Sequence, residues 1–539
     1  MMVAAGEIFA QISPSTLVPT PSIDWEALVP YLLLAGGGVL LLMIFSLVGK
    51  WLSSSFASYF TFAIGLATLG SSFALWRRIG DEGATSTLSG MVGVDRFSVF
   101  ITGLIGAVVA LVALLSHDYI KRERLWGTEL YVLLLLSATG GVIMAGANDL
   151  IVLFLGLEVL SIAVYVLAAM HLRRSTSQEA GMKYFVLGAF SSAFFLYGVA
   201  LIYGAVGSTK LSYIADFLEA GSLEKDGLLL GGFALLLVGM FFKIAAVPFH
   251  AWTPDVYQGS PTPVVAYMAS AVKAAGFAAL LRVFVAAFES YQGDWQPIIY
   301  VIALLTMFAG GAMAIVQTDV KRMLAYSSIS HAGFILVGVQ AATDEGVAAA
   351  LFYLAAYAAI AIGSFAIVGM VATGARDSNA DNLSTGESRG ESMADSRGES
   401  MADSNEATSE NHIAIYRGLA KNRPVLSAAF MVLLLAQAGV PFTTGFFAKF
   451  AIISAAADAR SFLLAIFAMI SAVISAFIYL RLLVAMYLPG QQSTSESSLE
   501  KPSILESTVV ALTVAFTLTF GIIPGYLYDL TQEALIALL

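Results

Sequence analysis

Four ionisable residues of this chain lie inside long apolar stretches. Glu158 lies in the middle of LIVLFLGLEVLSIAVYVLAAM, and Lys243, Lys273 and Lys449 lie inside three other such stretches. A charge at bilayer depth is costly, so residues of this kind mark ion or proton paths and need partners. A lysine can take up and release a proton when its apolar surroundings favour the neutral form and a nearby carboxylate favours the charged form. The sequence therefore predicts charge movement through a membrane.

Two further residues, His331 and Lys183, are weaker candidates for the same chemistry. His331 lies in the apolar helix around SSISHAGF, where a histidine is either a satisfied core residue or a proton relay. Lys183 follows Glu179 by four residues, a spacing that also forms a simple ion pair at a helix end. Structural alternatives remain for the others: Glu158 as a neutral, hydrogen-bonded carboxyl, and Lys243 as a side chain that extends toward the membrane surface.

The remaining charged residues and the composition exclude several other kinds of site. Arg282 and Arg481 stay protonated, so we expect them as fixed counter-charges or near the membrane surface. His117, His171 and His412 fall in predicted loops or span ends, and we expect them on the surface. The chain has no cysteine, which excludes disulfides, thiolate zinc sites and cysteine-bound iron–sulfur clusters. We expect no cofactor, metal or nucleic acid on this chain.

The composition is that of an all-α polytopic membrane protein. The 539 residues are 58% hydrophobic and 12% charged, with a mean hydropathy of +0.83, which lies outside the range of soluble domains. Apolar runs recur along the chain, and we predict about fourteen transmembrane helices and no strands. Loops after odd-numbered spans carry more lysine and arginine than the others, which predicts both termini on the non-cytoplasmic side.

The seventh and twelfth predicted spans are broken by proline. Pro248 follows Lys243 by five residues, and Gly439 and Pro441 precede Lys449. Proline removes a backbone donor and clashes with the preceding turn, so each helix should open near bilayer depth. The two breaks share the string Val-Pro-Phe on spans that run in opposite directions. Spans 4–8 and 9–13 are therefore predicted to form two inverted five-helix repeats.

These features divide the chain into four parts. They are an N-terminal region with spans 1–3 (1–128), a first repeat (129–290), a second repeat (291–490) and a C-terminal part with span 14 (491–539). The second repeat contains an insert, at about 376–412, with a tandem SRGESMAD at Ser388–Asp395 and Ser396–Asp403. Nine acidic residues and three arginines give this insert −6 of the net charge of −10. Its low apolar content predicts a disordered cytoplasmic loop.

The segments around the candidate residues resemble the antiporter-like membrane subunits of respiratory complex I. The resemblance rests on NDLIVLFLGLEVLSIAVY, GMFFKIAAVPFHAWTPDVYQGSPTPVVAYMASAVKAAGF, DVKRMLAYSSISHAGF and AGVPFTTGFFAKF, which occur in this order between about Val94 and Leu488. Within that family, a lysine rather than a glutamate at Lys449, and a chain end soon after span 14, favour the subunit N branch over the M and L branches. The insert departs from the family's short loop.

The resemblance implies roles for the candidate residues. It implies that Glu158 and Lys243 interact in a first half-channel, that Lys273 carries protons toward the middle and that His331 lies on a central hydrophilic axis. Lys449 would form the exit site, and Lys183 matches a family lysine in the sixth span.

The resemblance also implies an activity and partners. The activity would be proton translocation across a bacterial plasma (inner) membrane, coupled to quinone reduction in other subunits. M-like and K-like subunits would be neighbours in the lipid bilayer, and partner subunits would hold NADH, FMN, iron–sulfur clusters and quinone. Two alternatives stay open: a cation/proton antiporter or membrane hydrogenase subunit of the same fold, and a membrane-arm scaffold whose charges only seal the complex.

Overall fold

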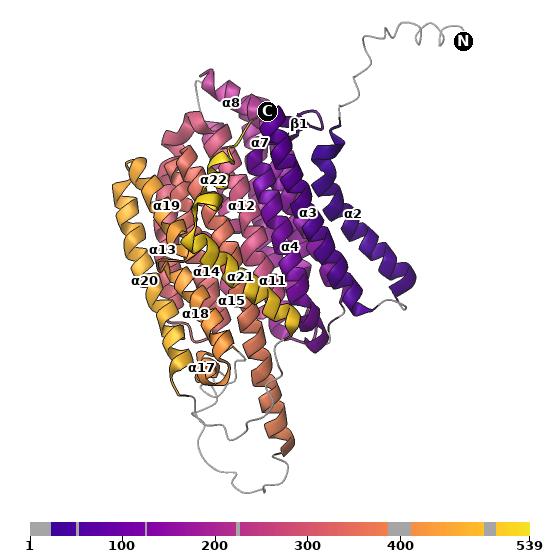
Figure 1. The fold of residues 1–539 in the computed structure, drawn as a ribbon. Helices are drawn as coiled ribbons and strands as arrows, with labels where there is room; N and C mark the ends of the chain where they lie inside the picture. Colours follow the sequence, from indigo (N-terminus) through magenta and orange to yellow (C-terminus); the bar gives the residue numbers. More distant parts are fainter. Residues whose placement is uncertain are drawn as a thin grey trace, which may run out of the picture.

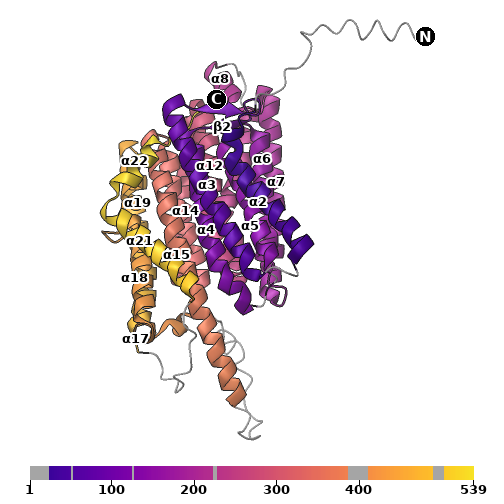
Figure 2. The ribbon, with the colours of Figure 1, turned by 45° about the vertical axis from the view of Figure 1, so that its right-hand side comes forward.

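The computed structural model describes residues 23–49, 53–123, 125, 127–221, 227–385, 411–489 and 503–538. They form a bundle of long helices (Figures 1 and 2), and 13 of the described helices are long and apolar enough to cross a membrane. The predicted all-α polytopic architecture is confirmed. The twelfth predicted span is absent from these 13 because its break divides it into two short helices.

The first eight spans form one part of the bundle, and the eighth contains two π-helical stretches. In chain order the helices are α2 (Trp25–Val48), α3 (Ser54–Glu82), α4 (Arg96–Glu123), α5 (Thr128–Gly146), α6 (Leu150–Ala168), α7 (Ser175–Val206), α8 (Leu211–Glu219), α9 (Gly227–Ile244), α10 (Trp252–Gly259), α11 (Thr262–Tyr267), η3 (Met268–Val272), α12 (Lys273–Leu280) and η4 (Leu281–Ala287). The seventh span is α9, and the predicted break at Pro248 separates it from the short helix α10.

The remaining helices pack beside this part. They are η5 (Glu289–Tyr291), α13 (Gln292–Ile315), α14 (Val320–Ala341), α15 (Asp344–Thr385), η6 (Ile413–Tyr416), α17 (Leu419–Asn422), α18 (Pro424–Ala438), α19 (Thr444–Asp458), α20 (Phe462–Tyr487), α21 (Ile504–Ile522) and α22 (Gly525–Glu533). The second predicted break separates α18 from α19. Helix α21 runs obliquely across the bundle over α15 (Figure 1).

A short antiparallel hairpin connects α3 to α4, although the sequence predicted no strand. Its strands, β1 (Thr85–Thr87) and β2 (Val92–Val94), have three residues each, which is too short for a recognisable alternating pattern. The backbone N–H of Asp24, before α2, donates to Thr87 Oγ1 at 3.0 Å. The backbone N–H of Ala537, after α22, donates to Asp95 at 2.9 Å. The two ends of the described chain therefore lie at the same end of the bundle.

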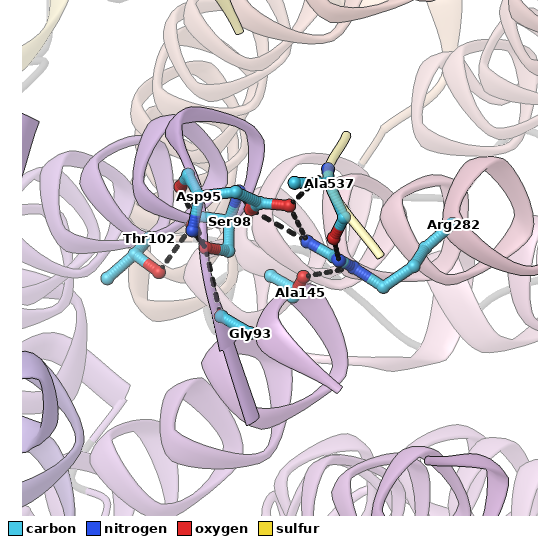
Figure 3. Close-up of polar contacts among 7 residues, drawn as sticks. All are labelled: Gly93, Asp95, Ser98, Thr102, Ala145, Arg282 and Ala537. Atoms are coloured by element: carbon cyan, nitrogen blue, oxygen red, sulfur yellow. Dashed lines mark hydrogen bonds and ion pairs between the residues drawn. The ribbon is translucent and has the colours of Figure 1, made fainter. Parts of the chain in front are cut away.

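Arg282 anchors the C-terminal tail to this end of the bundle (Figure 3). Its Nη2 donates to both carboxylate oxygens of Asp95, at 2.8 and 2.9 Å. Its Nε donates to the carbonyl of Ala145 at 3.0 Å, and its Nη1 donates to the carbonyl of Ala537 at 3.3 Å. The expected counter-charge role corresponds here to a buried ion pair that joins η4, α5, the start of α4 and the tail.

Helix α15 extends further than the predicted end of span eleven at Ala372. It reaches Thr385 and projects from the bundle (Figures 1 and 2), so residues 376–385 of the predicted loop are helical rather than disordered. Lengthening an existing helix needs no new nucleation, which explains why a polar segment can continue it. The tandem octapeptide lies outside the described residues.

Glycines set the closest helix approaches in both parts of the bundle. A Cβ at Gly140 of α5 would lie 2.3 Å from the backbone nitrogen of Leu160 in α6. A Cβ at Gly310 of α13 would lie 2.5 Å from the backbone nitrogen of Ser330 in α14. Small residues at such crossings allow the backbones of membrane helices to touch, and these contacts fix how α6 and α14 present their polar residues.

Candidate functional site

Lys243 is buried at the end of α9, where the seventh span breaks. Its ammonium donates to Ser161 Oγ of α6 at 2.8 Å, and the Ser161 hydroxyl donates to the Leu157 carbonyl at 2.5 Å. Glu158, on the same helix, has one buried carboxylate oxygen, Oε1, without a hydrogen-bond partner among the described residues. No direct ion pair between Glu158 and Lys243 is present among the described residues, and the hydroxyl that binds Lys243 belongs to Ser161, three residues after Glu158 on α6.

A small cavity adjoins Lys243. Its volume is about 10 Å³, and Ser161, Ser191 and Ser192 contribute polar groups to its lining. That volume is about the minimum for one water molecule, which needs two or more polar partners. On another side, the ammonium lies 5.8 Å from the ring centroid of Tyr184, a distance at which a cation is attracted to an aromatic face. The direct contacts described for the Lys243 ammonium are therefore with a neutral hydroxyl and an aromatic ring.

Lys273 lies where the π-helical η3 passes into α12. Its ammonium donates to both the side-chain oxygen and the backbone carbonyl of Ser328 in α14, each at 2.5 Å. It also lies 5.3 Å from the ring centroid of Tyr357. Single π-helical turns inside α-helices are frequent at functional sites, and this one precedes a lysine that is buried at mid-span.

His331, in α14, has a tyrosine at each ring nitrogen. Its Nδ1 is 2.6 Å from the Tyr353 hydroxyl of α15, and its Nε2 is 3.0 Å from the Tyr479 hydroxyl of α20. Tyr479 continues to Ser327 Oγ at 2.5 Å, and the Ser327 hydroxyl donates to Gln437 Oε1 at 3.2 Å. All five side chains are buried, so they form one hydrogen-bonded chain away from solvent.

Lys449 lies across the second break, in α19. Its ammonium donates to the carbonyls of Gln437 and Ala438 at 2.9 and 3.0 Å. These are the last residues of α18, where the partial negative charge of the helix dipole favours a cation. Gln437 thus holds Lys449 through its main chain and Ser327 through its side chain. The structure thereby connects His331 and Lys449 through Gln437, and Lys273 binds Ser328, the residue that follows Ser327.

Lys183 does not belong to this network. Its ammonium lies 2.7 Å from Glu179 and 2.7 Å from Asp255, and its side chain is 42% exposed. Asp255 also accepts from Arg322 at 2.6 Å. Lys183, Asp255, Glu123 and Lys321 are among the residues that line a cavity of about 490 Å³ at this end of the bundle.

The prediction that His117 and His171 lie on the surface is wrong. Both are buried: His117 Nε2 lies 2.7 Å from Lys121 Nζ, and His171 Nε2 lies 3.0 Å from Glu123. Neighbouring helices cover these span ends, which a local sequence pattern does not reveal. His412 is half-buried. Arg481 donates to the carbonyl of Ile315, the last residue of α13, at 2.6 Å and to the carbonyl of Gln317 at 3.2 Å.

Comparison with known proteins identifies the fold. A family model described as NADH:quinone oxidoreductase/Mrp antiporter, transmembrane, matches residues 147–387 and 399–475. NADH-quinone oxidoreductase subunit N 3 of Streptomyces griseus is 36% identical, over 97% of this chain and 96% of that protein. The chain belongs to the subunit N family of NADH-quinone oxidoreductase.

Solved structures are also similar to this chain. A chain of respiratory complex I from Thermus thermophilus with bound aureothin has a TM-score of 0.72 and 30% identity, covering 93% of this chain and 99% of that chain. A chain of the Mrp complex from Dietzia sp. has a TM-score of 0.78 at 19% identity, covering 95% and 97%. This second likeness shows the fold alone.

Sequence reasoning missed the neutral members of the network in this subunit N family member. Ser161 and Ser327 lie inside the motifs that carry the resemblance, and Gln437 directly precedes one of them. All three could have been found from their positions near Glu158, His331 and the second break. Tyr479 lies in a plain apolar helix, and no local signal marks it.

Proposed function

We propose that this chain is a proton-translocating membrane-arm subunit of NADH-quinone oxidoreductase and that protons pass along Glu158, Lys243, Lys273, His331 and Lys449. The observation that carries the proposal is the buried network of Ser327, Tyr479 and Gln437 between His331 and the helix end that binds Lys449. Buried polar networks in apolar helices are costly unless they are satisfied, and protonatable groups in such a network can exchange protons.

The first transfer would take place around Lys243. Its ammonium is held by a neutral hydroxyl, so the charge on this lysine depends on the charge of Glu158 nearby. The cavity lined by Ser161 and Lys243 can hold one water, which would offer Lys243 a further neutral partner. A change in the charge of Glu158 would then load or unload Lys243.

The second transfer would run between Lys273 and Lys449. Lys273 binds Ser328, and the preceding residue, Ser327, belongs to the hydrogen-bonded chain that ends at His331. The hydrogen bonds described for Lys449 go to two carbonyls, and its ammonium also lies 5.0 Å from the ring centroid of Phe334. Each lysine can therefore lose its proton without leaving a buried carboxylate unpaired, which keeps the cost of changing its charge low.

Lys183 would act at the entrance instead of on the central axis. It lies on the wall of the 490 Å³ cavity together with acidic and basic side chains. Carboxylates at this cavity, such as Glu123 and Glu179, attract protons from solvent. In the proposed orientation, with both termini on the non-cytoplasmic side of a bacterial plasma membrane, this cavity faces the cytoplasm.

We also propose that residues 129–290 and 291–490 are the two inverted repeats, between the N-terminal region (1–128) and the C-terminal part (491–539). Two pairs of residues with the same separation support this. Gly140 and Gly310 make the close helix contacts, and Asp149 and Asp319 cap the helices that follow.

The chain would work without a redox centre of its own. In this proposal NADH, FMN, iron–sulfur clusters and quinone are bound by partner subunits, and M-like and K-like subunits are its membrane neighbours. The Thermus complex that contains a similar chain is a respiratory complex I, which supports an assembly of this kind.

The test is Lys449→Ala and Lys243→Ala in the complete complex, reconstituted in proteoliposomes. Proton pumping and NADH oxidation are measured per assembled complex, with Lys421→Ala as control because Lys421 is exposed. We expect the pumping rate to fall in both variants of the buried lysines and to stay at the wild-type value in the control variant. Wild-type pumping by both test variants would overturn the proposal. If only assembly fell, while pumping per assembled complex stayed unchanged, the scaffold alternative would hold.

A further inference from the structure

The direction of the hydrogen bonds beside His331 follows from the number of protons available. Gln437 Oε1 is an amide oxygen and can only accept, so Ser327 donates to it, at 3.2 Å. A serine hydroxyl has one proton, and Ser327 Oγ must therefore accept from Tyr479, at 2.5 Å. Tyr479 has then used its own proton, so its oxygen accepts from Nε2 of His331, at 3.0 Å. The donor-to-acceptor direction of this series of hydrogen bonds is therefore set by Gln437.

The second nitrogen of His331 then has the opposite role. A neutral imidazole carries one proton, and with that proton on Nε2, Nδ1 accepts from the Tyr353 hydroxyl at 2.6 Å. We propose that Gln437, acting through Ser327 and Tyr479, holds neutral His331 in the Nε2–H tautomer and so makes Nδ1 the atom that takes up a transferred proton. This inference rests on the proposed function, because it names what selects the protonation site of one relay residue.

Proton uptake at Nδ1 requires little rearrangement. The ring gains one proton and one positive charge, and the Tyr353 hydroxyl turns from donor to acceptor; no other bond of the chain reverses. Uptake at Nε2 would require the hydroxyls of Tyr479 and Ser327 and the amide of Gln437 to turn together. The Gln437 amide is also tied by its Nε2, which donates to Ser364 at 2.8 Å, so the reversal would require the Ser364 hydroxyl to change from acceptor to donor as well.

The same glutamine connects this tautomer to the next lysine. The main-chain carbonyl of Gln437 accepts from Lys449 at 2.9 Å, while its side chain ends the chain from His331. A movement of the end of α18 that accompanies a change of charge on Lys449 would therefore move the group that fixes the His331 tautomer. Gln437, Ser327 and Tyr479 are positioning residues in this account.

Other titratable groups face His331 from the packed helices. Tyr353 and Tyr357 approach from α15, the latter with its ring centroid 4.7 Å from the imidazole, and Tyr479 approaches from α20. Lys273 and Lys449 act on it as more distant charges, and each of them is hydrogen-bonded elsewhere. The direct partners of the ring nitrogens are thus the two tyrosines.

The experiment measures the pH profile of pumping by the complete complex in proteoliposomes, per assembled complex, for Tyr479→Phe and Ser327→Ala. Tyr479→Phe removes the acceptor for Nε2–H. The loss of this hydrogen bond destabilises the charged imidazolium more than the neutral imidazole. Ser327→Ala removes the acceptor for the Tyr479 proton, so Tyr479 turns its proton toward Nε2. We expect the pH of half-maximal pumping to fall by about one to two units in both variants.

The matched control is Ser330→Ala, on the same helix and next to His331. Ser330 bonds the Met307 carbonyl and Ser475, at 3.2 and 3.3 Å, and has no part in the chain to Gln437. We expect its pH profile to match the wild type. If His331→Ala abolishes pumping while Tyr479→Phe and Ser327→Ala keep the wild-type profile, the inference is overturned and the proposed function stands. Wild-type pumping by His331→Ala, Lys243→Ala and Lys449→Ala would overturn the proposed function itself.

Discussion

Arg282 and Asp95 form an ion pair in which both side chains are almost fully buried, with exposures of 0% and 1%. The Asp95 carboxylate accepts from Arg282 twice and from the backbone of Ala537 once. Removing one member of a buried pair leaves the other charge without compensation, which costs more than the pair itself contributes. This relationship ties the C-terminal tail to the bundle.

The first prediction is that Asp95→Asn destabilises the protein by about 3–5 kcal/mol. Replacing both charges, as in Asp95→Leu with Arg282→Met, should recover most of the loss because no charge stays buried. Thermal unfolding in detergent measures the stability of the single variant and of the double variant. Glu533→Gln is the control: its pair with Arg96 is half exposed and should contribute about 0–1 kcal/mol. An Asp95→Asn effect as small as the control would refute the prediction.

The second prediction concerns Ser161, the acceptor for Lys243. Ser161→Ala removes a hydrogen bond to a charged group, and we expect pumping to fall about tenfold or more. Ser161→Thr retains the hydroxyl and should restore much of the rate. Ser137→Ala is a matched control, because Ser137 is also buried and bonds the Leu160 carbonyl of α6 at 3.1 Å. Equal pumping by Ser161→Ala and Ser137→Ala would contradict the assignment.

The sequence predicted the spans and their breaks well because both follow from local chemistry. A long apolar run has few alternatives to a membrane helix, and Pro248 and Pro441 cannot continue one. The ionisable candidates were equally visible, since a charge in such a run is rare. Their burial in the structure agrees with that expectation for Lys243, Lys273, His331 and Lys449.

The partners of these residues were not predictable in the same way. Serine and tyrosine hydroxyls are common in apolar helices, and nothing in α20 distinguishes Tyr479 from its neighbours. Contacts between distant parts of the chain were also hidden. Arg122 and Glu506, 384 residues apart, form a partly buried ion pair at 2.5 Å, yet each residue alone is typical of a span end.

The third prediction concerns the close contact of α5 with α6. A Cβ at Gly140 would lie 2.5 Å from the Gly156 carbonyl oxygen as well as against Leu160, so the helices must separate. Gly140→Ala should therefore destabilise the protein by about 1–3 kcal/mol, measured by thermal unfolding. Gly204→Ala is the control, since nothing lies within 4 Å of its Cβ position, and it should be neutral or stabilising. A Gly140→Ala variant more stable than Gly204→Ala would disprove the close packing of α5 against α6.

The fourth prediction is a pH dependence that arises from Asp255, in the short helix α10 outside the spans. Burial raises the pKa of this carboxyl, and the hydrogen bonds from Lys183 and Arg322 lower it by more, so that its pKa lies below the usual range. The stabilisation is therefore present above the pKa of the unfolded state, about 3.9, and is lost as the pH falls through the lowered value.

Asp255→Asn tests this dependence. The wild type should have a higher unfolding temperature than Asp255→Asn at pH 7 and at pH 5, and the difference should shrink once the pH falls below about 4. Asp216→Asn, on the exposed face of α8, should differ little from the wild type at every pH. A difference for Asp255→Asn that grows as the pH falls would mean that the carboxyl is bound in its protonated form, because only then would folding favour the added proton.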